Sequence, residues 1–116
     1  MQYMLLIHGD ETAEATEEER NAIFGEYFVF SDSIRDQTLS SAPLEPSTAT
    51  TTVRVRDGET LITDGPFAET KEQLGGFYLI EVETLDEALE IAARCPGAKH
   101  GTVEVRPLMP VPARQS

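Results

Sequence analysis

The sequence has one cysteine, no tryptophan, few basic residues and no apolar run near the roughly 20 residues that a membrane-spanning helix needs. The single thiol, Cys95, excludes an internal disulfide bond. Residues 1–11 lack both the basic flank and the cleavage site of a signal peptide. We therefore expect a cytoplasmic protein with no membrane partner.

Basic side chains are also scarce: 9 Lys and Arg residues stand against 21 Asp and Glu residues, for a net charge of -12. Such a surface repels phosphate backbones, so direct nucleic-acid binding is not expected. The histidines, His8 and His100, have no flanking residues at metal-ligand spacing. The chain also lacks a phosphate loop, a nucleophile elbow and a Cys-His arrangement, so we predict neither a metal nor a cofactor.

The length of 116 residues and the ordinary share of apolar residues predict one compact domain. We place this domain at residues 1–107. Residues 108–116 contain prolines and are expected to form a tail.

Apolar patterning predicts the elements of this domain. Residues 3–8 and 76–82 are apolar at both alternating positions, which indicates strands covered on both faces. Capping-box patterns at Thr16 and Thr84 start two helices, the first reaching about Arg35 and the second closing at Pro96-Gly97. Residues 51–63 form a hairpin around Asp57-Gly58, residues 102–106 form the last strand, and residues 36–52 form a connector with a short extended piece.

This order predicts an α+β fold of the ferredoxin-like type, an antiparallel sheet with two helices on one face. The other face still carries apolar side chains from residues 3–8 and 76–82, and a second copy of the chain would cover them. We therefore predict a homodimer in which two sheets meet face to face.

Several separated motifs resemble those of the YCII-related family, in particular its DGPF group: MLLIHGDE, STATTTVRVRD, DGPFAETKEQLGGFYLIEV and HGTVEVRPLM. The resemblance implies a ferredoxin-like domain that pairs into a dimeric α/β barrel. It also implies a His-Asp site in a cleft beside the sheet, dehydrochlorinase-like relatives, and an association with extracytoplasmic-function sigma factors. One departure is that residues 16–35 contain no histidine to match the first helix of the broader family.

Asp64 and His8 are the candidate catalytic residues. Asp64 ends a strand beside the rigid Gly65-Pro66 turn, where a carboxylate can serve as a general base or can simply accept hydrogen bonds from its own turn. His8 ends the first strand, where its imidazole can transfer protons or fill a structural position.

Three further residues are candidates for substrate binding. Arg54 can bind an anionic ligand bidentately or pair with a glutamate on the next strand. Phe67 can wall a pocket or seal the dimer seam, and Tyr27 belongs either to the core or to the site.

Two functions follow. The first is an enzyme or binder of a small molecule, with acid/base chemistry at Asp64 and His8. The second is a non-catalytic accessory protein of a sigma-factor system, with an acidic surface for a protein partner.

Overall fold

The computed structural model describes residues 1–113. Its strands are β1 (Gln2–Gly9), β2 (Thr38–Pro43), β3 (Thr51–Arg56), β4 (Glu59–Asp64), β5 (Gln73–Glu81) and β6 (Thr102–Pro107). Its helices are α1 (Glu17–Ser33), the short 3₁₀ helix η1 (Ser47–Ala49), α2 (Leu85–Arg94) and α3 (Pro96–His100). Of the predicted tail, residues 114–116 lie outside the described part.

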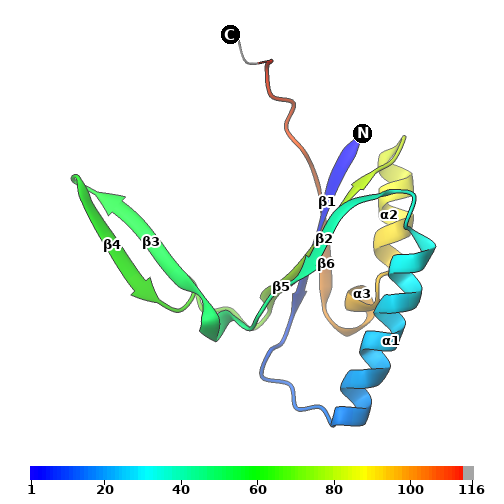
Figure 1. Ribbon diagram of the computed structural model, residues 1–116, viewed down its shortest axis with the longest axis horizontal. Coiled ribbons are helices and arrows are strands. Elements are labelled where there is room, and N and C mark those ends of the chain that lie inside the picture. The colour runs from blue at the N-terminus through cyan, green and yellow to red at the C-terminus, as the bar shows by residue number, and fades with distance from the viewer. Residues whose placement is uncertain (114–116) are drawn as a thin grey trace.

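Four strands form one antiparallel sheet in the order β2-β5-β1-β6 (Figure 1). With the hairpin set aside, the element order is strand, helix, strand, strand, helix, strand, so the ferredoxin-like α+β prediction is confirmed. The helices lie on one side of this sheet, and the short helix α3 joins the expected pair there. Within residues 1–113, no helix combines the length and hydropathy that crossing a bilayer requires.

The core lies between the sheet and the helices. Alternate side chains of β1 and β5 point to this side and are buried, with Leu5 and Ile80 fully inaccessible. Helix α1 contributes Phe30, whose ring meets that of Tyr78 edge to face at a centroid distance of 5.2 Å. On the opposite side, the sheet presents half-buried apolar residues, namely Met4, Leu6, Phe77 and Leu79. We call these four residues the open face.

Both helix starts follow the sequence prediction. The hydroxyl of Thr16 accepts a hydrogen bond from the Glu19 amide, and the Glu19 carboxylate accepts one from the Thr16 amide, which completes a capping box. The Thr84 hydroxyl likewise accepts from the Glu87 amide. The second helix closes before Pro96-Gly97 as predicted, since α2 ends at Arg94 with Cys95 as its C-cap. The short helix α3 that follows was not predicted, and Pro96 occupies its first turn, where the missing N–H is not needed.

The hairpin β3–β4 forms as predicted around Asp57 and Gly58, both of which have positive φ. However, it stands apart from the four-stranded sheet as a separate two-stranded ribbon. The edge strand beside β5 is β2 instead, from the segment that we predicted to be mainly a connector. The Ser- and Thr-rich sequence of β2 carries no apolar pattern that would predict a strand, because an edge strand needs few buried side chains.

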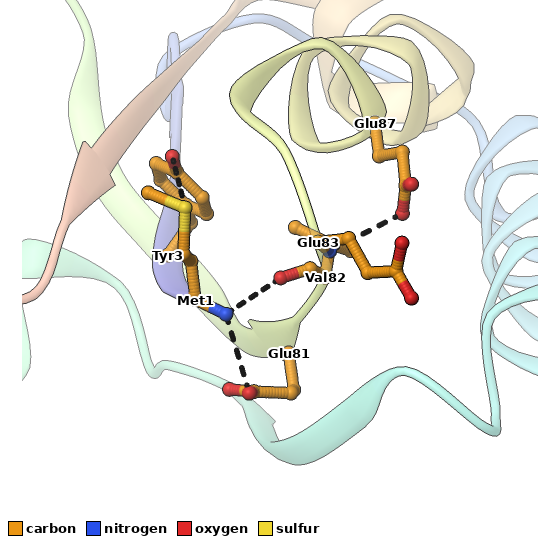
Figure 2. Close-up of polar contacts among 6 residues, drawn as sticks. All are labelled: Met1, Tyr3, Glu81, Val82, Glu83 and Glu87. Atoms are coloured by element: carbon orange, nitrogen blue, oxygen red, sulfur yellow. Dashed lines mark hydrogen bonds and ion pairs between the residues drawn. The ribbon is translucent and has the colours of Figure 1, made fainter.

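The first residues are tied to the end of β5 (Figure 2). The amino group of Met1 donates to the carbonyl oxygen of Val82 at 2.6 Å and to a carboxylate oxygen of Glu81 at 3.2 Å. These contacts fix β1 beside β5, and thereby the position of His8 at the other end of the strand.

Candidate active-site cleft

A cleft of about 820 Å³ opens between the first half of α1 and the ends of β1, β2 and β5. Its border is mainly apolar and includes Ile23, Phe24, Tyr27, Phe28, Ala42, Pro43, Phe77 and Tyr78. Phe24 and Phe28 border the cleft from α1, and both side chains are exposed, which leaves aromatic surface open to a ligand.

Tyr27 is half-buried in the cleft. Its hydroxyl oxygen lies close to Gly97 at the start of α3. The approach is so close that a Cβ atom on residue 97 would be only 2.8 Å from this oxygen. Burial, together with the neighbouring thiol of Cys95, raises the pKa of Tyr27 well above its usual range. The phenol therefore stays protonated at neutral pH and can donate a hydrogen bond.

A second hydroxyl pair stands on the sheet side of the cleft. The Ser31 and Tyr78 hydroxyl oxygens are 2.7 Å apart in a hydrogen bond. Burial raises the pKa of Tyr78 as well, although the bond from Ser31 acts in the opposite direction. Both groups border the cleft, so a ligand that enters it meets neutral hydroxyls surrounded by aromatic carbon.

His8 lies at the rim of the cleft, at the end of β1. Its Nε2 lies 2.6 Å from a carboxylate oxygen of Glu104 on the neighbouring strand β6. Glu104 is directly opposite Leu6 in the register, so the ring is directed along the open face of the sheet. A carboxylate at this distance orients the imidazole.

Asp64 lies at the last position of β4 and does not border the cleft. Within the described residues, no hydrogen bond or ion pair joins it to His8. The turn after Asp64 is held by other groups: the Gly65 amide donates to the Thr50 carbonyl, and the Thr52 hydroxyl donates to the Gly65 carbonyl.

Arg54 and Phe67 are also outside the cleft. Arg54 is opposite Leu61 in the hairpin and, among the residues that the structure covers, forms no ion pair, so the expected cross-strand glutamate partner is missing. Phe67 is 78% exposed. Of the five candidate residues from the sequence, only His8 and Tyr27 border the same cleft within one chain.

The model of the YCII-related domain matches residues 1–112. The chain belongs to the YCII-related family. A relative of this YCII-related protein, an uncharacterized protein of Rhizobium meliloti (strain 1021), is 56% identical over 69 residues. That match covers 58% of this chain and 56% of the relative, so the aligned part spans little more than half of the relative's length.

A solved structure with the same fold is the 5-chloro-2-hydroxyhydroquinone dehydrochlorinase TftG from Burkholderia phenoliruptrix AC1100, in complex with 2,5-dihydroxybenzoquinone. The TM-score is 0.54 at 13% sequence identity, and the alignment covers 94% of each chain. At this identity the likeness establishes the shared fold of the YCII-related protein. Neither comparison supports the sigma-factor alternative.

Sequence reasoning missed Ser31, Tyr78 and Glu104 in this YCII-related protein. Ser31 and Tyr78 come from different elements, and only the packing of α1 on β5 brings them together. Glu104 has a detectable signal, because strand 102–106 alternates and places one acidic residue between two valines. Within residues 1–113, no group of three or more His, Cys, Asp or Glu side chains is placed to hold a metal ion.

Proposed function

We propose that this YCII-related protein is an enzyme that binds a small hydroxylated aromatic or quinoid molecule in the cleft and carries out acid/base chemistry on it. The observation that carries the proposal is the composition of the cleft: aromatic side chains, protonated phenols and a carboxylate-paired histidine at the rim. The shared fold with a quinone-bound dehydrochlorinase supports the choice of ligand class.

Each group has a chemical role. The rings of Phe24 and Phe28 supply apolar surface for a flat ligand, and their exposure in the free protein is relieved when such a ligand binds. Tyr27 donates a hydrogen bond to a ligand oxygen, because its pKa is raised and it keeps its proton. Ser31 and Tyr78 supply a second polar contact deeper in the cleft.

His8 transfers the proton. Glu104 holds the ring by its Nε2 on the open-face side of β1, so Nδ1 is the nitrogen left for a ligand at the rim of the cleft. Glu104 acts as a positioning residue in this scheme. Proton transfer by a positioned side chain contributes roughly 10²- to 10⁴-fold to a rate, which sets the expected loss for His8→Gln.

The chain also acts as a homodimer in this proposal. The open face carries four half-buried apolar side chains, and a second copy covers them without any further component. This pairing is the one that the sequence predicts, and it would place the His8–Glu104 pair, at the rim of each cleft, beside the partner copy.

Calorimetric titration with 2,5-dihydroxybenzoquinone tests the binding step. Tyr27→Phe is expected to raise the dissociation constant about tenfold. One lost hydrogen bond costs about 1.4 kcal/mol of binding free energy, which corresponds to this change. Tyr3→Phe is the matched control, because it removes the same hydroxyl from a buried tyrosine outside the cleft and should leave the affinity within twofold. Equal effects of the two variants, or no binding by the wild type, would contradict the proposal.

Turnover is tested with a panel of hydroxylated and chlorinated hydroquinones. We expect His8→Gln to lower kcat about 100-fold or more while the dissociation constant for the quinone changes little. Turnover that survives His8→Gln would remove the histidine from the mechanism.

A further inference from the structure

The hairpin β3–β4, which we call the arm, projects away from the body of the molecule (Figure 1). All of its residues are exposed except Thr52, which is half-buried. The arm makes the chain unusually extended: the radius of gyration is 16.7 Å, against about 13 Å for a compact domain of this length. A two-stranded ribbon is marginally stable by itself in water, so the arm needs a surface to pack against.

The two faces of the arm differ in character. Val53 is opposite Ile62, and Val55 is opposite Thr60. The two pairs are two residues apart along the strands, so their side chains share one face of the arm. Val53, Val55 and Ile62 are 60%, 59% and 68% exposed. The opposite face carries Arg54 and Arg56 with Leu61, so the first face is the apolar one.

The direction of the arm indicates what it packs against. In Figure 1 the helices cover one side of the sheet, and the arm extends on the other side, where the open face lies. A second copy that covers the open face therefore meets the arm as well. We infer that the arm is exchanged between two copies of the chain and that its apolar face packs on the partner copy.

Charge is compatible with the same occupant. Two copies of a chain with a net charge of -12 repel each other, so we expect the surface that joins them to carry few acidic side chains. On the apolar face of the arm, the strands place one charged residue, Asp64, whereas Arg54, Arg56 and Glu59 lie on the opposite face. Arg56 there donates a hydrogen bond to the Val55 carbonyl of its own chain at 2.9 Å. The apolar face is therefore the one that can meet an acidic partner copy.

Asp64 and Phe67 lie where the partner copy would meet the arm. Asp64 is on the apolar face of the arm, opposite Thr51 and in line with Ile62, so it is turned toward the partner copy. Arg54 is on the other face, so these two candidates do not serve the same site. Phe67 follows at the base of the arm, and its 78% exposed side chain extends the apolar surface. This step rests on the proposed dimer.

Sedimentation equilibrium on the full chain tests the arm. Ile62→Asp and Val53→Asp should each raise the dimer dissociation constant at least tenfold, whereas Leu61→Asp on the opposite face should change it less than threefold. An unchanged constant for Ile62→Asp, an equal effect of Leu61→Asp, or a wild-type chain that is monomeric at micromolar concentration would overturn the inference.

A photocrosslinking residue at position 62 provides a second readout that does not depend on a charge-disrupted variant. Mixed dimers of isotopically light and heavy chains should give crosslinks between light and heavy chains. Crosslinks confined within one chain would show that the arm folds back on its own body and would overturn the inference. Neither readout uses a ligand, so failure of the arm and failure of the cleft chemistry are distinguishable.

Discussion

Gly101→Ala is the substitution whose effect follows most directly from the packing around His8. Gly101 precedes β6 and lies against the end of β1, where a Cβ on residue 101 would overlap the carbonyl oxygen of His8 and lie 3.2 Å from the Cα of Gly9. Both obstacles are backbone atoms of a strand that is paired on both sides, so neither can move aside cheaply.

The expected cost is about 1–3 kcal/mol, the usual range for overpacking, and the rigid backbone places it at the upper end. A loss of this size lowers Tm by roughly 4–8 °C for each kcal/mol in a domain of about 100 residues. Urea unfolding followed by circular dichroism measures the free energy, because the chain has no tryptophan to report by fluorescence.

Gly25→Ala is the matched control. Gly25 is inside α1, and a Cβ there meets nothing within 4 Å, so alanine should stabilise the helix by about 0.5–1 kcal/mol. Gly101→Ala should also shift the NMR signals of His8 and Glu104, whereas Gly25→Ala should not. If Gly101→Ala were as stable as the wild type, the close approach of β6 to His8 would be refuted.

Three further predictions concern stability. Leu5→Ala, at a fully buried position, should lower the free energy of unfolding by about 2–5 kcal/mol, and Val55→Ala on the exposed arm should change it by less than about 0.5 kcal/mol in the monomer. Thr16→Ala should cost about 1 kcal/mol in urea unfolding, because it removes the hydroxyl half of the capping box, and an unchanged midpoint would contradict that role. The hydrogen bond from Lys99 lowers the pKa of Glu26 in the folded state, so the pair stabilises the protein above the unfolded value of 4.5 and loses this effect as the pH falls through the lower folded pKa. The Tm difference between the wild type and Glu26→Gln should therefore be present at pH 7 and vanish in strong acid, and a difference that grows on acidification would reverse this assignment.

The sequence predicted the sheet-and-helix layer well because its signals are local. The helix caps at Thr16 and Thr84 and the Asp57-Gly58 turn each require only a few neighbouring residues, and all three form. The reciprocal half of the predicted capping box is present at Thr16 but not at Thr84, where the Glu87 carboxylate accepts from the Glu83 amide instead. The edge strand β2 was largely missed because pairing along one edge, unlike burial, leaves little trace in composition.

The site was predicted only in part, for a related reason. His8 and Tyr27 were candidates because of their residue types, and both border the cleft. The bond between Ser31 and Tyr78 depends on how α1 crosses β5, and the contact between His8 and Glu104 depends on strand register. Neither relation is visible in a linear pattern. Asp64, favoured for its rigid turn, lies outside the cleft of its own chain, and its proposed surroundings belong to a second copy.

Chemical-shift mapping with 2,5-dihydroxybenzoquinone is the most direct test of the proposed active site. We predict saturable shifts at backbone amides around the cleft, with the largest at Ile23, Tyr27, Ser31 and Gly76. A separate hollow of about 510 Å³ between α1 and α2, bordered by Val29, Ala93 and Lys99, serves as the internal control and should stay unchanged. Shifts confined to that hollow, or none up to the solubility limit of the quinone, would contradict the account.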